Sequence, residues 1–103
     1  MLEEIMDEQE RVVLFLETML DKSQSIENRD SAAIYLGHCD SDEGLKSLIE
    51  CACNDHEDST LLQACGSAIA EIWDRNKNFD IDVVLGQVSP PAKEKIHGWL
   101  NSK

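Results

Sequence analysis

The chain has 103 residues, of which 42% are hydrophobic and 29% charged, so it can fold as one domain over residues 1–103 and is not intrinsically disordered. Its 21 acidic residues outnumber its 9 basic ones and give a formal net charge of −12. Binding to nucleic acid or to an anionic membrane surface is disfavoured, because both require positive patches.

Apolar residues at helical spacing predict a first helix over residues 2–22. Its apolar stripe consists of Val12, Val13, Leu16, Met19 and Leu20. Acidic residues occupy its first turns and Lys22 closes it, which is the polarity that a helix dipole favours. We expect the acidic outer side of this helix to cap one end of the fold.

Two further helices are predicted on either side of an acidic turn. The second spans residues 27–38 and has a small-residue face that lets another helix approach closely, made of Ala32, Ala33, Leu36 and Gly37. Asp40 with Glu43 three positions later has the pattern of a capping box, so the third helix is predicted to begin near Asp42. The apolar stripe of the third helix consists of Leu45, Leu48, Ile49, Ala52 and Cys53.

The fourth helix is predicted over residues 59–75, with Asp58 or Ser59 accepting hydrogen bonds from its first free amides. Apolar residues cover two adjoining faces of this helix, which indicates a central and well-covered position; Trp73 is expected in the core.

Two shorter helices complete the chain. Residues 81–88 keep helical spacing, and although their β-branched content also permits a strand, a short helix is favoured. Pro90 and Pro91 interrupt it and open a final helix that contains Ala92 and Leu100.

Five to six helices with short connections predict an all-α domain, either a stacked helical array or a compact helical bundle. Leu36 and Ile69 occupy matching positions 33 residues apart, a spacing within the range of helical repeats.

One stretch resembles a known family. Residues 28–37 form an alanine-rich helix that ends in Leu-Gly, residues 40–50 form an aspartate turn and a helix of Leu-x-x-Leu-Ile type, and residues 54–58 form a second acidic turn. This order resembles that of small bacterial HEAT-like repeat proteins. The resemblance implies a short right-handed array of helical hairpins whose surfaces bind other proteins.

The amino terminus is acidic where a secretory signal is basic, and no apolar run approaches the roughly 18 residues that span a bilayer, so a cytoplasmic protein is expected. In that compartment the four cysteines, Cys39, Cys51, Cys53 and Cys65, are expected to stay reduced and to pack as small hydrophobic residues.

No sequence motif indicates a metal site, a cofactor site or an enzyme. Cys51 and Cys53 point about 200° apart on a helix, so this pair does not chelate one ion. The turn after Asp40 differs from a calcium loop, because its glycine is fifth and its twelfth residue is Cys51. No signature links a cysteine nucleophile to a base.

Charge therefore carries the functional inference. The acidic composition and the resemblance favour a protein-binding module that is monomeric when free, namely a bacterial immunity protein that binds and neutralises a basic, nuclease-type toxin. The predicted partner contacts are Tyr35, Asp40, Asp42, Glu43, Asp55, Glu57 and Asp58.

Three other interpretations stay open at this point. The chain can be a HEAT-like adaptor or scaffold subunit in a larger cytosolic complex. The four cysteines can serve a metal or redox sensor. The acidity can simply keep the protein soluble, with each acidic residue of the turns acting as a helix cap.

Overall fold

A computed structural model describes residues 7–102 and shows six α-helices and no strand within that range. The helices are α2 (Glu8–Leu20), α3 (Ile26–Gly37), α4 (Asp42–Ala52), α5 (Ser59–Asn76), α6 (Ile81–Leu85) and α7 (Pro90–Asn101). The predicted all-α class is confirmed, and residues 81–85 form the short helix rather than a strand.

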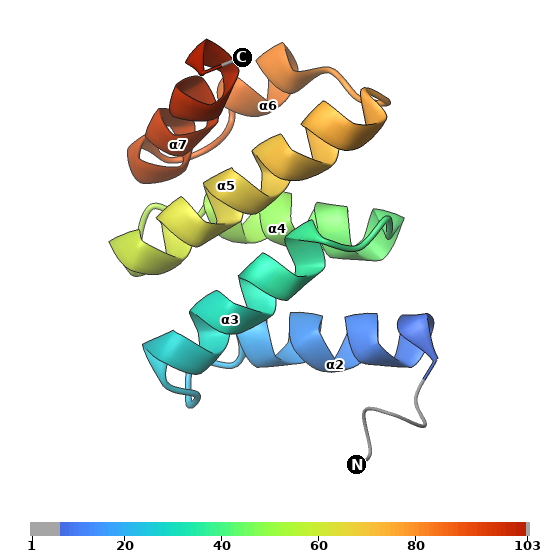
Figure 1. Cartoon of the computed structure of the whole chain (residues 1–103). Coiled ribbons are helices and arrows are strands. Elements are labelled where there is room, and N and C mark those ends of the chain that lie inside the picture. The colour runs from blue at the N-terminus through green and yellow to red at the C-terminus, as the bar shows by residue number, and fades with distance from the viewer. Residues whose placement is uncertain (1–6, 103) are drawn as a thin grey trace.

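The helices form three successive antiparallel hairpins: α2 with α3, α4 with α5, and α6 with α7 (Figure 1). Helices α3, α5 and α7 lie side by side in one layer, and α2, α4 and α6 run in the opposite direction behind or beside them. The central helix α5 packs against α3, α4 and α7. Every second helix therefore begins on the same edge of the molecule.

Close approach of the helices within the first layer depends on two glycines. A Cβ atom at Gly37 would lie 2.8 Å from the Cβ of Ala68, and one at Gly66 would lie 2.5 Å from the carbonyl oxygen of Ala92. The backbones of α3, α5 and α7 are therefore nearer to one another than larger residues would permit. This confirms the small-residue face that the sequence predicts around Gly37.

The core lies between the two layers. Its largest fully buried side chains are Met19, Leu36, Leu48, Leu61, Ile69, Ile96, Val12 and Cys65. Three of these side chains belong to α5, which confirms the predicted central position of that helix. Trp73 is partly buried against the core and its indole Nε1 donates a hydrogen bond of 3.1 Å to the carbonyl oxygen of Phe79.

One predicted helix start and one predicted helix cap need correction, whereas the predicted start of α4 at Asp42 is confirmed. Helix α2 begins at Glu8 because Asp7 has an extended backbone and its side chain accepts a 2.8 Å hydrogen bond from the amide of Glu10. The part of the predicted helix before Asp7 lies outside the described residues. At α4 the cap is Ser41, whose hydroxyl accepts from the amide of Gly44, so the predicted capping box at Asp40 is wrong.

A buried ion pair joins the first two hairpins. Arg29 on α3 and Glu57 in the turn before α5 form two parallel hydrogen bonds of 3.0 and 2.8 Å, and their side chains are only 7% and 9% exposed. The Nε of Arg29 also donates to the carbonyl oxygen of Met19 at 2.8 Å. One guanidinium thus fixes the end of α2, the start of α3 and the start of α5 relative to one another.

Candidate functional site

Helices α2, α4 and α6 begin on one edge of the molecule (Figure 1), and acidic residues lie at each of these starts. We call this the acidic edge, and its members are Asp7, Glu8, Glu10, Asp40, Asp42, Glu43, Asp80 and Asp82. Five of them lie in first turns, where a carboxylate is stabilised by the positive end of the helix dipole. The preference of helix starts for acidic residues and the antiparallel topology together concentrate negative charge on one edge.

The first two helix starts of this edge enclose a shallow hollow of about 530 Å³. Its lining residues are Glu8, Gln9, Val12, Asp40, Ser41, Asp42 and Glu43. The side-chain amide of Gln9 donates a 3.0 Å hydrogen bond to Glu43, which ties α2 to α4 across the hollow. Exposed carboxylates on its rim create a negative surface that suits a cationic side chain.

Asp40 contributes negative charge to this edge and also forms hydrogen bonds that stabilise the fold. Its carboxylate accepts hydrogen bonds from the side chain of Asn76 at 2.9 Å and from the Nε of Arg75 at 3.0 Å. These two bonds hold the pKa of Asp40 below its ordinary value. Arg75 also donates to the carbonyl oxygens of Gly37 and Cys39, so this contact fixes the turn before α4 to the end of α5.

The predicted contact residues do not form a single cluster. Asp40, Asp42 and Glu43 precede or open α4, whereas Asp55, Glu57 and Asp58 follow it, and the 11 residues of α4 separate the two groups by about 16 Å. The turns project from opposite edges of the array (Figure 1). This corrects the expectation that both turns present one surface.

The acids of the second turn are bound within the molecule. Asp55 accepts a 2.6 Å hydrogen bond from the hydroxyl of Ser89, and Asp58 caps α5 by accepting from the amide of Thr60 at 2.8 Å. Glu57 is paired with Arg29, whose hydrogen bonds hold the pKa of Glu57 below its ordinary value. Each of these three carboxylates therefore has a partner within the fold; the side chain of Glu57 is buried with that of Arg29, whereas Asp55 and Asp58 stay exposed.

Tyr35 is also committed to internal contacts. Its ring stacks on Phe15 with a centroid distance of 4.2 Å, and its hydroxyl accepts a 3.1 Å hydrogen bond from the Nε of Arg11. The half-buried ring therefore packs α3 against α2 instead of projecting as an aromatic anchor for a partner.

The acidic edge includes five residues that sequence reasoning did not select: Asp7, Glu8, Glu10, Asp80 and Asp82. A signal for them exists, because Asp7, Glu8 and Glu10 precede the predicted apolar stripe that starts at Val12, and Asp80 and Asp82 flank Ile81, where the next such stripe starts. Helices that alternate in direction place every second start on one edge, so an antiparallel array would have grouped these acids with Asp42.

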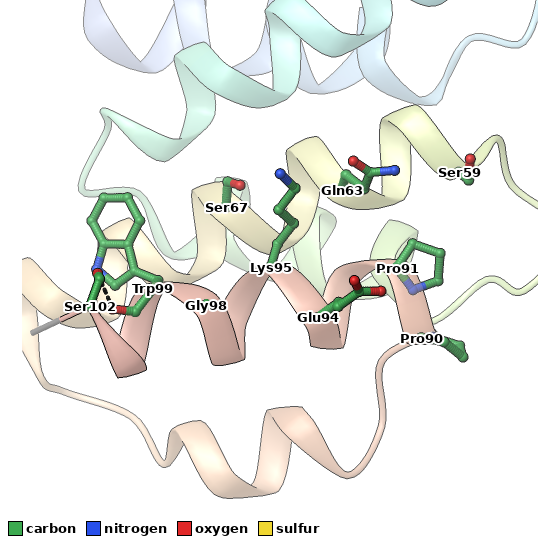
Figure 2. Close-up of a pocket in the computed structure, with 10 residues that line it drawn as sticks. All are labelled: Ser59, Gln63, Ser67, Pro90, Pro91, Glu94, Lys95, Gly98, Trp99 and Ser102. Atoms are coloured by element: carbon green, nitrogen blue, oxygen red, sulfur yellow. Dashed lines mark hydrogen bonds between the residues drawn. The ribbon is translucent and has the colours of Figure 1, made fainter.

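A hollow of about 790 Å³ lies between α5 and α7 (Figure 2). Ser59, Gln63 and Ser67 line it from α5, and Lys95 and Trp99 line it from α7. Figure 2 shows Lys95 reaching across the space between the two helices. These groups offer hydrogen bonds and one aromatic ring to a ligand.

The four cysteines have free thiols, and those of Cys39, Cys51 and Cys65 are buried as the sequence predicts. The thiol of Cys65 lies 3.9 Å from the sulfur of Met19. A hydrogen bond with Cys51 and burial together raise the pKa of Cys65. Within residues 7–102 no three histidine, cysteine or acidic side chains are grouped closely enough to hold a metal ion.

Scans of protein-family models, of curated proteins and of solved structures found no match. Among the described residues, none of the helices combines the length and the apolar character needed to cross a bilayer.

Proposed function

We propose that this protein is an acidic protein-binding module, and specifically a bacterial immunity protein that binds and neutralises a basic, nuclease-type toxin. The observation that carries the proposal is the acidic edge, where eight carboxylates lie around three helix starts. The nearby cations Arg75 and Lys77 are already engaged by Asp40 and Asp74.

The acidic edge has the properties that attract a basic protein. Its exposed carboxylates add to a net charge of −12 and create a long-range field that speeds association with a positive surface. A nuclease needs such a positive surface to bind the phosphates of its substrate. An acidic edge that occupies this surface would block the substrate by competition.

The proposal is tested by neutralising exposed members of the edge that neither cap a helix nor anchor Arg75. The edge variant combines Glu8→Gln, Asp42→Asn and Glu43→Gln. A matched control combines Glu27→Gln, Glu50→Gln and Glu94→Gln, which removes the same charge from exposed positions elsewhere. Wild-type protein, edge variant and control are each immobilised and exposed to a lysate of the native cell, and retained proteins are identified.

We expect the wild type and the control to retain a basic nuclease domain, and the edge variant to bind it about tenfold more slowly at low salt. The difference should shrink as salt is raised, because exposed charges are screened. Equal association rates for the edge variant and the control would contradict the acidic edge as the docking site. Retention of assembly subunits instead of a nuclease would favour the alternative function, an adaptor in a larger complex.

A further inference from the structure

Helix α2 lies at the end of the array, and one of its faces stays uncovered in the described structure (Figure 1). We call this the α2 outer face, and its residues are Gln9, Glu10, Val13, Leu14, Glu17, Leu20 and Asp21. Three of them are large and apolar, with exposed fractions of 37% for Val13, 40% for Leu14 and 44% for Leu20. The sequence predicts an acidic outer side here; the acidic residues Glu10, Glu17 and Asp21 are present, and the exposed apolar residues among them were not predicted.

Exposed apolar and acidic residues are interspersed on this face. Val13, Glu17 and Leu20 follow one another at spacings of four and three residues, so they share one side of the helix, and Leu14 lies beside Val13. The exposed apolar residues, from Val13 to Leu20, extend over about two turns, or roughly 10 Å. Part of this face borders a shallow hollow of about 360 Å³, lined by Gln9, Glu10, Val13, Leu14 and Glu17.

An apolar surface of this kind suits a further helix. In stacked helical arrays each hairpin covers the apolar side of its neighbour, and the terminal helices need polar outer faces to stay soluble. Helix α2 has three exposed apolar residues where a preceding hairpin would pack. Their distribution over two turns fits the apolar side of an amphipathic helix, which presents residues at spacings of three and four.

Charge defines the chemistry of the partner helix. Glu10, Glu17 and Asp21 lie among the apolar residues of the α2 outer face, and the face carries no lysine or arginine. The neighbouring Arg11 turns inward to the hydroxyl of Tyr35. A second copy of this chain is disfavoured, because its own α2 would bring the same three acids into contact with these.

We propose that the α2 outer face docks an amphipathic helix of the basic partner, with an apolar stripe of Leu or Ile and flanking Lys or Arg residues. The apolar stripe would pack on Val13, Leu14 and Leu20, and the flanking cations would meet Glu10 and Glu17. This inference rests on the proposed function and adds to it the structural element that the partner contributes. Glu10 belongs to both surfaces, so the α2 outer face and the acidic edge adjoin at the start of α2.

The test uses two synthetic 14-residue peptides made of leucine and lysine only. In the first peptide the leucines fall at helical spacing, and in the second the same residues are permuted so that no apolar stripe forms. Each is labelled with a fluorophore and titrated with the full chain while anisotropy is recorded. We expect the amphipathic peptide to bind at least tenfold more tightly than the permuted one.

Surface variants locate the binding site. Val13→Ser with Leu14→Ser should weaken binding of the amphipathic peptide about tenfold. The matched control combines Ile34→Ser and Val83→Ser, two apolar residues that are 52% and 54% exposed on other helices, and should change affinity less than twofold. Circular dichroism melting curves of each variant serve as the control for folding.

Each other outcome overturns the inference. Equal binding of both peptides would mean that charge alone attracts them, and this result would leave the acidic edge and the proposed function intact. Equal weakening by the control pair would place the site elsewhere. A concentration-dependent dimer in analytical ultracentrifugation that the Val13 and Leu14 substitutions abolish would identify a second copy as the occupant.

Discussion

Replacing Glu57 by glutamine should destabilise the protein strongly, although sequence reasoning assigns this residue to partner binding. Glutamine keeps the size of the side chain but removes its charge and its second acceptor oxygen. Arg29 would then keep a buried positive charge without a counter-ion, since its side chain is only 7% exposed. The substitution therefore removes the ion pair while leaving the packing around it unchanged in volume.

The expected loss is about 3 kcal/mol. Breaking a buried ion pair by removing one partner costs roughly 3–5 kcal/mol, and the lower end applies here because the Nε of Arg29 keeps its bond to Met19. A domain of this size has a total stability of about 5–15 kcal/mol. One isosteric change would thus remove a fifth or more of the free energy of unfolding.

Urea denaturation followed by circular dichroism measures this loss. With a slope of about 1.5 kcal/mol per molar, the midpoint should fall by roughly 2 M. Glu43→Gln is the matched control at an exposed site and should change stability by less than about 0.5 kcal/mol. A cost below about 1 kcal/mol for Glu57→Gln would refute the reasoning, because it would show that the pair is not desolvated.

The pH dependence provides a second measurement of the same pair. Hydrogen bonds from Arg29 lower the pKa of Glu57 in the folded state, while the unfolded chain keeps a value near 4.5. A depressed carboxyl pKa adds stability above the unfolded value and loses it as pH falls through the folded value. The difference in unfolding free energy between wild type and Glu57→Gln should therefore be largest at pH 7 and should decrease below pH 4.5.

Three further substitutions probe the packing of α5 against α7 and the buried carboxyl group of Asp30. Gly66→Ala should lower the free energy of unfolding by about 1–3 kcal/mol, because the new Cβ would overlap Ala92. Gly98→Ala is the matched control, because its Cβ meets open space, and it should raise the free energy of unfolding by roughly 0.5–1 kcal/mol. Equal effects of the two substitutions in urea denaturation would contradict the close approach of α5 and α7. Burial and the nearby Asp58 raise the pKa of Asp30, whose Oδ1 is buried without a hydrogen-bond partner in the described structure. A raised carboxyl pKa destabilises the fold as pH rises through that value, so Asp30→Asn should be more stable than wild type at pH 7, and the advantage should vanish below pH 3.8. Parallel stability curves from pH 3 to pH 7 would contradict this assignment.

The sequence predicted the helices well where local signals set their limits. Asp58 satisfies the first amides of α5, and the proline pair begins α7, so both starts follow from a few neighbouring residues. The start of α2 was missed because the acidic residues before Asp7 resemble a first turn. The predicted cap at Asp40 failed because Arg75, which is 35 positions away, binds its carboxylate.

The candidate site was harder to predict than the fold. The acidic turns around Asp42 and Asp58 look alike in sequence, yet one is exposed at the acidic edge and the other is bound up with Arg29 and Ser89. Such partners lie about 30 residues away and depend on how the hairpins stack. The resemblance to HEAT-like repeats and the immunity function remain predictions.

The position of the acidic edge at helix starts has a consequence for how this protein can evolve. Glu8, Asp42 and Asp82 each face the positive end of a helix dipole, so each contributes some tenths of a kcal/mol to its own helix whether or not a partner is bound. A mutation that discards one of these carboxylates weakens a helix as well as any interface built on it. Under the proposed function, selection for stability and selection for partner recognition would therefore act on the same side chains, and both would oppose loss of these acidic residues.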